Sequence, residues 1–300
     1  MNAMFEDTPH GDDTTATPLR RIARKMHTDL PKPGFAGPGH TAVEVFASDA
    51  LDRTDPFVML MDDRLDFRAG QPVGEAHPHA GLETVTLVLE GSLDDAAEGL
   101  LEAGDLAWMT AGRGIVHNED VKATGRARIL QLWVALPGHE RHALPDLQLV
   151  PLRSLPIRRE PGVEVRLYSG RTGTLASPTR NRVPMTVVDV RLEPGATVEQ
   201  ALPGSYTAFV YVIEGSLETG GEALASGEVG WFERVAPADS RLLLRAGPAG
   251  ARAVLYAGQP LGEPIVHHGP FVAGSRHELA AYHQAYSAGR FDRLGALAPR

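Results

Sequence analysis

Two short segments of this 300-residue chain carry side chains that commonly bind metal ions. In the first, His77 and His79 flank a proline, and in the second, His117 and Glu119 flank an asparagine. Residues i and i+2 of a β-strand point to the same face, so each pair would face one way. If the two segments lie on neighbouring strands of a barrel, three imidazole nitrogens and one carboxylate oxygen converge inside it. This set suits a divalent first-row metal and leaves coordination positions open for water, substrate or dioxygen.

The elements that position these residues are predicted to be strands. The chain has 32 glycines and 23 prolines, which indicates many turns, few long helices and an all-β fold. Gly112 and Gly114 precede the second histidine segment and permit a tight corner that returns the chain toward the first. Short runs rich in β-branched and aromatic residues, bounded by Gly or Pro, predict strands at residues 41–46, 83–89, 129–136, 186–192, 208–213 and 254–257.

The segments outside these strands have distinct compositions. Residues 1–19 are polar and lack an apolar period, so we expect a disordered tail. A basic cluster that begins at Arg20 is interpreted as solvated surface. Residues 137–162 are rich in Pro, Arg and Glu and predict a linker. Ser275 followed by Glu278 is typical of a capping box, so a C-terminal helix is expected over residues 277–290.

The second half of the chain repeats the first. Residues 88–93 (VLEGSL) match residues 212–217 (VIEGSL), and residues 104–108 (GDLAW) match residues 227–231 (GEVGW). The repeat predicts a duplicated small antiparallel barrel or jelly roll. At the repeat offsets, the positions that correspond to the four candidate ligands hold other residue types, namely Ala201, Pro203, Ser240 and Leu242. We therefore expect a single metal site, in the first domain.

Composition excludes several other classes of protein. The absence of cysteine rules out a disulfide framework, a zinc ribbon and a thiol nucleophile. A net charge of −9 argues against direct nucleic-acid binding, which needs clustered cations. No apolar run approaches the roughly 20 residues that span a bilayer, and the acidic start is unlike a signal peptide. We expect a cytoplasmic protein that does not contact a membrane.

Several other residues are interpreted as structural. His267 and His268 are adjacent, so in a strand they would face opposite ways, and we interpret them as structural or interfacial. Trp108 and Trp231 occupy equivalent places in the repeat and predict barrel core. Trp133 is interpreted in the same way.

The motifs resemble those of the pirin family, within the cupin superfamily. The resemblance rests on HPHAGLETVTLVLEGSL, WMTAGRGIVHNE, LQLWVALP and GEPIVHHGPFV. It implies two tandem cupin (jelly-roll β-barrel) domains with a short C-terminal helix. The resemblance places the metal ligands at His77, His79, His117 and Glu119. Glu83, a ligand in many other cupins, would instead lie behind the ligands and orient one of the imidazoles.

The resemblance also implies a domain organisation and a cofactor. We expect a tail over residues 1–19, a metal-binding cupin domain with its linker over residues 20–148, and a metal-free cupin domain with the helix over residues 149–300. The favoured cofactor is one Fe(II) ion, although nickel, manganese, copper or zinc would suit the same ligands. Two packed cupins in one chain make a monomer credible.

Two functions follow from the resemblance. The first is a quercetin 2,3-dioxygenase, which takes a small aromatic flavonol and dioxygen, with Glu119 as the catalytic base that accepts the flavonol hydroxyl proton. The ring then opens and carbon monoxide is released. The alternative is a non-catalytic, iron-dependent redox sensor that regulates a protein partner. The physiological substrate, partner and native metal stay open at this point.

Overall fold

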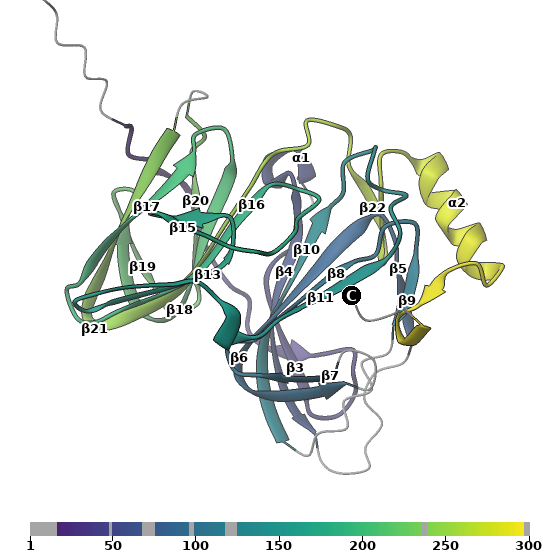
Figure 1. Cartoon of the computed structure of the whole chain (residues 1–300), viewed down its shortest axis with the longest axis horizontal. Coiled ribbons are helices and arrows are strands. Elements are labelled where there is room, and N and C mark those ends of the chain that lie inside the picture. The colour runs from purple at the N-terminus through teal and green to yellow at the C-terminus, as the bar shows by residue number, and fades with distance from the viewer. Residues whose placement is uncertain are drawn as a thin grey trace, which may run out of the picture.

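The computed structural model describes residues 17–47, 50–67, 76–95, 99–117, 125–235 and 239–296. Two β-barrels lie side by side, with the longer helix at the outer edge of the first barrel (Figure 1). The helical elements in these residues are α1 (Leu51–Thr54), α2 (Arg276–Ser287) and the 3₁₀ turns η1 (Leu152–Ser154) and η2 (Leu294–Ala296). The expected all-β architecture with a short C-terminal helix is confirmed. No helix in the described ranges is long and apolar enough to cross a membrane.

The first barrel is built from a large and a small sheet. The large sheet has the order β11-β8-β6-β10-β4-β3-β2, with β7 beside β6. Its strands are β2 (Lys32–Pro33), β3 (His40–Ala47), β4 (Phe57–Phe67), β6 (Leu82–Asp95), β7 (Gly99–Glu102), β8 (Leu106–Thr110), β10 (Gly125–Ala135) and β11 (Asp146–Val150). The small sheet has the order β24-β9-β5 and consists of β5 (His77–His79), β9 (Ile115–His117) and β24 (Asp292–Arg293).

The second barrel is one sheet with the order β1-β20-β18-β21-β16-β13-β12, in which β17 joins β21 and β19 joins β18. Its strands are β1 (Ile22–His27), β12 (Ile157–Glu160), β13 (Val163–Ser169), β16 (Met185–Leu192), β17 (Thr197–Pro203), β18 (Thr207–Thr219), β19 (Glu222–Ala225), β20 (Glu228–Phe232) and β21 (Asp239–Gly258). Two small hairpins complete the fold, formed by β14 (Arg171–Thr172) with β15 (Leu175–Ala176) and by β22 (Val266–His268) with β23 (Phe271–Ala273).

The local predictions agree with these elements except in the linker. The six expected strands fall within or overlap β3, β6, β10, β16, β18 and β21. Helix α2 begins after Ser275, whose hydroxyl accepts the Glu278 N–H at 3.2 Å, as the capping motif predicts. The linker prediction for residues 137–162 is wrong in part, because β11 pairs with β8 and β12 pairs with β13.

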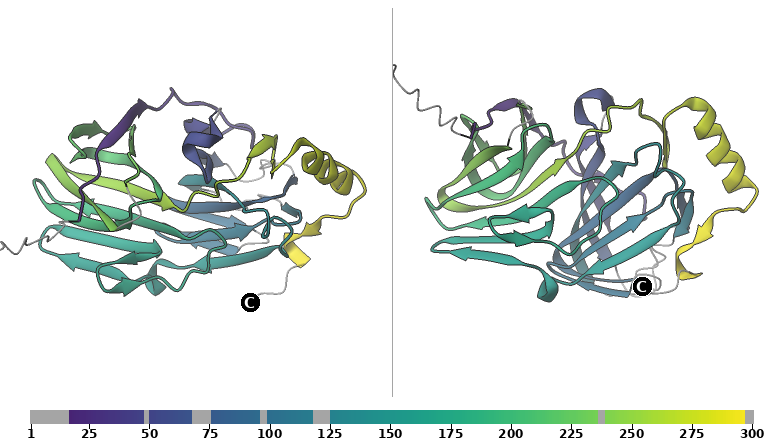
Figure 2. Two further views of the ribbon diagram at one scale, coloured as in Figure 1. Left: turned by 90° about the horizontal axis from the view of Figure 1, so that it is seen from above. Right: turned by 45° about the horizontal axis from the view of Figure 1, so that its top comes forward.

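Both ends of the described chain cross to the other barrel (Figure 2). Strand β1 pairs with β20 of the second barrel, whereas the predicted boundary placed residues 20–148 in the first domain. The segment that contains α2 and β24 returns from the second barrel, and β24 pairs in parallel with β9 of the first. Pairing between residues far apart in the sequence determines both crossings, which local patterns do not encode.

Arg20 anchors the crossing at the N-terminal end. It is buried, which corrects its assignment to solvated surface, and its guanidinium donates to the Ser240 hydroxyl at 2.8 Å and to the backbone carbonyls of Pro203 and Tyr206. Burial lowers its pKa to about 10, which leaves the guanidinium charged near neutral pH.

The barrels share one apolar core across their interface. Alternate residues of β6 and β18 point into it, and they are Val85, Leu87 and Leu89 from the first barrel and Phe209, Tyr211 and Ile213 from the second. Trp108 and Trp231 also lie in this cluster. The two tryptophans are therefore core residues as predicted, but of the core between the barrels.

Candidate metal centre

The small sheet of the first barrel brings three histidines together. Strands β5 and β9 are antiparallel, and His77 lies directly opposite His117 in their register. The ring centroids of His77 and His117 are 4.3 Å apart. The ring centroid of His79 is 5.0 Å from each of the other two. One nitrogen from each ring lies within 4.8 Å of the others. The predicted meeting of the two distant segments is confirmed for these three residues.

The environment of His79 favours a neutral imidazole, the form that binds metal ions. His79 is 2% exposed and His117 is 6% exposed, whereas His77 is partly exposed. Burial lowers the pKa of His79 well below its usual value, and the charges of His117 and His77 lower it further. Protonation of His79 is thus disfavoured at neutral pH.

The residues present fit a divalent metal ion. Nδ1 of His79 is buried and has no hydrogen-bond partner among the residues that the structure describes. A buried ring nitrogen without a partner is costly unless a ligand satisfies it. The backbone carbonyl of Pro270 interacts with the same ring, an outer contact that orients metal-binding histidines in many proteins. His77, His79 and His117 could hold one metal ion and leave positions on it open.

Glu119, the predicted fourth ligand and catalytic base, lies outside the described residues. Its roles therefore stay predictions.

Glu83 lies on the other face of the sheet from the histidines. Glu83 lies opposite Val134 of β10, and Val134 belongs to the core between the barrels. Trp133, one residue earlier on β10, faces the interior of the first barrel, and its ring centroid is 5.0 Å from that of His79. The Glu83 carboxylate accepts the Thr110 hydroxyl hydrogen bond at 2.7 Å.

Glu83 is fully buried, and its surroundings favour the protonated form. Burial raises its pKa to about 7, although the Thr110 hydroxyl, the Trp108 indole and Arg182 of the second barrel each act to lower it. Oε2 has no hydrogen-bond partner of good geometry in the described part of the chain. The contacts found for this carboxyl point toward the core between the barrels, and the predicted orienting contact with an imidazole stays a prediction.

Glycines and the returning C-terminal segment hold the ligand strands. Gly112 and Gly114 have φ of +49° and +129°, and they form the tight corner that the sequence predicts. A Cβ atom at Gly114 would lie 2.4 Å from the ring of Phe291, so only glycine admits this close packing. The Val272 N–H donates to the carbonyl of Ala80, immediately after His79, at 2.9 Å. Residues from the end of the chain thus support both ligand segments.

The corresponding positions of the second barrel have other surroundings. Ala201 is exposed, Leu242 lies in the apolar interior, and the Ser240 hydroxyl is occupied by the buried guanidinium of Arg20. The second copy of the repeat therefore keeps the barrel, but other side chains stand at the positions equivalent to the candidate ligands.

Comparison with known proteins agrees with the fold. The pirin family model matches residues 39–134, and the model of the pirin C-terminal cupin domain matches residues 187–292. The chain belongs to the pirin family. Pirin-1 of Arabidopsis thaliana is 36% identical over 267 residues, which cover 87% of this chain and 90% of the relative.

Solved structures extend the comparison. The structure of a quercetin 2,3-dioxygenase from Acinetobacter baumannii is 26% identical with a TM-score of 0.80, covering 91% of this chain and 98% of that chain. The bacterial pirin YhhW from Escherichia coli, solved in complex with nickel(II), is 18% identical with a TM-score of 0.54, covering 82% and 99% of the two chains. The likeness to YhhW concerns the fold.

Two aromatic residues lie beside the histidine cluster that the sequence analysis did not assign to it. Trp133 contacts His79 edge-on from within the barrel. Phe35 contacts His77 edge-on from a turn before β3. The segment 34–39, Gly-Phe-Ala-Gly-Pro-Gly, is a turn signal that could have drawn attention to Phe35, but the sequence does not reveal that this turn reaches the histidines.

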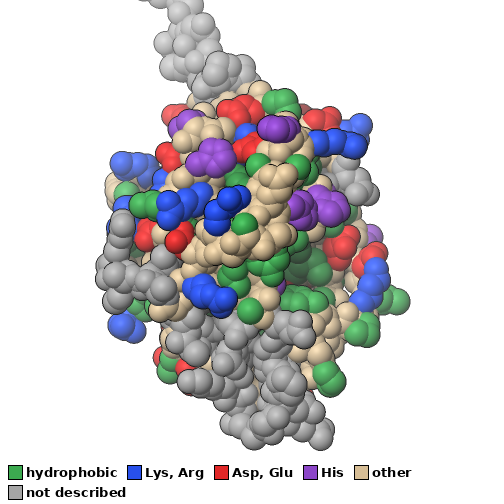
Figure 3. All heavy atoms as spheres, turned by 90° about the vertical axis from the view of Figure 1, so that its right-hand side faces the viewer, with side chains coloured by type: hydrophobic (Ala, Val, Ile, Leu, Met, Phe, Trp, Pro, Cys, Tyr) green, Lys and Arg blue, Asp and Glu red, His purple; other side chains and the backbone are tan. Residues whose placement is uncertain are grey.

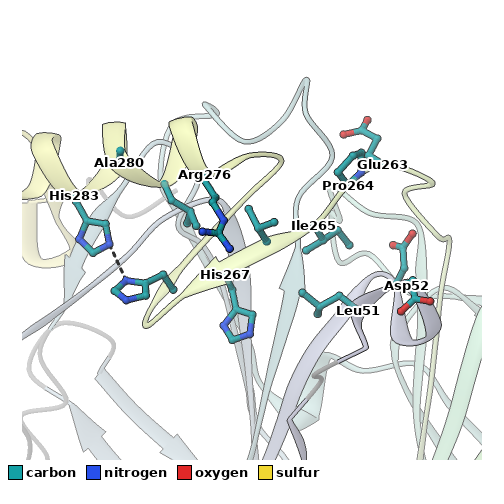
Figure 4. A pocket seen from close by; sticks show the side chains of 13 residues that line it. Leu51, Asp52, Glu263, Pro264, Ile265, His267, Arg276, Ala280 and His283 are labelled. Carbon is teal, nitrogen blue, oxygen red and sulfur yellow. Dashed lines mark hydrogen bonds between the residues drawn. The ribbon is translucent and has the colours of Figure 1, made fainter.

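A separate groove of about 930 Å³ lies between β22, α1 and α2 of this pirin (Figure 4). His267 and His268 line it, and His268 Nδ1 lies 3.0 Å from Nε2 of His283 on α2. Several histidines gather on this face of the molecule (Figure 3). His267 and His268 are both exposed, and His268 contacts His283 of α2.

Proposed function

We propose that this pirin is a metal-dependent dioxygenase that cleaves a flavonol such as quercetin, with Fe(II) as the resident metal. The observation that carries the proposal is the cluster of His77, His79 and His117, of which the last two are buried. The similarity to a structure described as quercetin 2,3-dioxygenase supports the substrate class. That relative is a quarter identical over nearly its whole length, so the likeness extends beyond one barrel.

Three histidines would hold the metal through neutral imidazoles. When bound, Fe(II) would supply positions for the substrate oxygen and for dioxygen. His79 is oriented by the Pro270 carbonyl, and the depressed pKa of its ring keeps a nitrogen lone pair available. The apolar walls of the barrel, which include Trp133 and Ile115, limit the access of water to this end.

Glu119 is proposed as the base. It follows the ligand His117 by two residues, so in an extended segment its carboxylate would face the same side. It would accept the proton of the flavonol hydroxyl and thereby leave the electron-rich anion that reacts with dioxygen. Both oxygen atoms of dioxygen then enter the products, and one ring carbon leaves as carbon monoxide.

The identity of the metal is a separate part of the proposal. Imidazole ligands also suit nickel, copper and zinc, and a pirin of the same fold was solved with nickel(II). Elemental analysis of freshly purified protein, followed by reloading of apoprotein with each ion, tests iron against the others.

The activity is tested by incubating the iron-loaded protein with quercetin in air and following the flavonol absorbance. We expect turnover well above that of free iron, loss of activity in His79→Ala, and parental activity in His268→Ala, which alters an exposed histidine outside the cluster. Turnover no faster than free iron would overturn the enzymatic proposal. It would leave the alternative, a metal-dependent regulator of a protein partner.

A further inference from the structure

Phe35 is a large apolar residue in an unusual place. Its side chain is 68% exposed, although it lies beside the buried histidine cluster. Its ring centroid is 5.5 Å from that of His77, with the planes at 76°. Aromatic rings favour such edge-to-face contacts. Phe35 therefore covers one side of a candidate ligand and keeps most of its own ring open to solvent.

The turn that carries Phe35 is well ordered by buried contacts. The Ala36 N–H donates to Nδ1 of His40 at 3.1 Å, so the ring proton of His40 is on Nε2, which donates to Asp63 at 2.9 Å. A Cβ atom at Gly34 would lie 2.3 Å from the His40 ring, so only glycine allows this packing. These contacts hold the backbone on both sides of Phe35.

A rigid turn that exposes a large apolar ring beside a metal-binding residue needs an explanation. Burial of a phenylalanine is worth about 1.5–3 kcal/mol, and this turn gives up most of that gain. The ring centroids of Trp133 and His79 are 5.0 Å apart and their planes meet at 85°, so a second aromatic ring adjoins the cluster. Two aromatic rings therefore adjoin the cluster, Phe35 at His77 and Trp133 at His79.

We propose that Phe35 forms the outer aromatic wall of the site and selects ligands that carry an aromatic ring next to their metal-binding oxygens. Phe35 lies just before residues 39–134, the part of the chain that the pirin family model matches. The inference rests on metal binding at the three histidines, and it deepens the proposed flavonol activity by assigning the residue that recognises the ring.

Two hydroxamic acids test this inference without any turnover. Benzohydroxamic and acetohydroxamic acid share one metal-binding group, and only the first carries a ring. Their dissociation constants are measured on the zinc-loaded full chain, which is redox-inert. We expect Phe35→Ala to weaken benzohydroxamate binding about tenfold, or about 1.4 kcal/mol, and to leave acetohydroxamate binding unchanged.

Three further variants sharpen the comparison. Phe35→Trp should restore the preference for the aromatic ligand, whereas Phe35→Leu, which keeps apolar volume without a ring, should restore it only in part. Leu30→Ala removes another highly exposed apolar side chain from the same segment and should change neither constant. The zinc content of every variant is measured to confirm that the histidine cluster is intact.

Equal weakening of both hydroxamates in Phe35→Ala would overturn the inference, because the ring would then act on the metal ligands. Unchanged binding of both would overturn it as well. If the protein shows no quercetin turnover while Phe35 still discriminates between the hydroxamates, the dioxygenase proposal fails and the aromatic wall stands.

Discussion

Replacement of Glu83 by glutamine should remove a pH-dependent loss of stability. The carboxyl is fully buried between the barrels, and burial raises its pKa to about 7 from the usual 4.5. As pH rises from about 4.5 to 7, the unfolded chain releases this proton and the folded protein retains it. The free energy of unfolding therefore falls across this window, and the loss is complete above about pH 7.

The magnitude follows from the two pKa values. At about 1.4 kcal/mol per pKa unit, the change from 4.5 to about 7 corresponds to about 3 kcal/mol. Glutamine has nearly the same shape, can keep the contact with the Thr110 hydroxyl and does not ionise. The stability of Glu83→Gln relative to the parent should therefore increase by about 3 kcal/mol between pH 4.5 and 7.5, and then stay constant.

The assay is urea unfolding of parent and variant, both stripped of metal, at half-unit steps from pH 4.5 to 8.5. Other titrating groups, including the histidines, contribute equally to both proteins and cancel in the difference. Glu228→Gln is the matched control. Burial opposes ionisation of Glu228 as well, but hydrogen bonds from Lys25 and the Ala225 N–H, with the charges of Lys25 and His27, outweigh it and lower its pKa.

The control should behave in the opposite way. The stabilisation that Glu228 provides is present above its usual pKa and is lost only as pH falls through its lowered value. Glu228→Gln should thus be less stable than the parent throughout the range from about pH 5 to 8. A flat difference for Glu83→Gln over the same range would show that its carboxyl ionises normally in the folded protein, and the reasoning from burial would be refuted.

Four other substitutions are expected to have separable effects. His79→Ala should lower the bound metal from about one ion per chain to near zero in elemental analysis, without unfolding the barrel by circular dichroism. Glu119→Gln should retain part of the metal and slow quercetin turnover by about a hundredfold in the absorbance assay; a parental rate would exclude Glu119 as the base. Arg20→Ala should cost about 3 kcal/mol in urea unfolding, because it leaves the buried Ser240 hydroxyl and two partly buried carbonyls without their donor, and an unchanged midpoint would contradict this. Gly114→Ala should lower both the melting temperature and the metal content through the clash with Phe291, whereas normal metal content would show that the corner tolerates a methyl group.

Local patterns predicted the elements and the three imidazoles well, because both depend on short spacings. The i, i+2 rule placed His77 and His79 on one face, and the repeat separated barrel residues from candidate ligands. The face toward which Glu83 points was not predictable in this way. It depends on how β6 is flanked by β8 and β10, and on a second barrel whose packing buries that face.

The contacts that the sequence did not reveal connect residues very distant along the chain. The Arg20 guanidinium donates a hydrogen bond to the Ser240 hydroxyl, and Phe35 contacts His77 from a turn about forty residues earlier in the sequence. Neither residue belongs to a periodic segment, so no spacing rule applies to it. The turn of Phe35 could be predicted from its glycines, but its destination depends on the buried His40–Asp63 pair.

The end of the chain explains how strands of only three residues can hold a metal site. Such short strands have few hydrogen bonds of their own, and a β-ladder of this length is marginal without further support. Strand β9 gains a second partner in β24, since the Asp292 N–H donates to the Gly114 carbonyl at 3.2 Å. The Phe271 side chain, 1% exposed, packs beside Ala80 at the end of β5. Because this segment emerges from the second barrel, that barrel contributes to the ligand geometry even though its own interior is filled with other side chains. Duplication thus supplied a scaffold that anchors the segment closing the site.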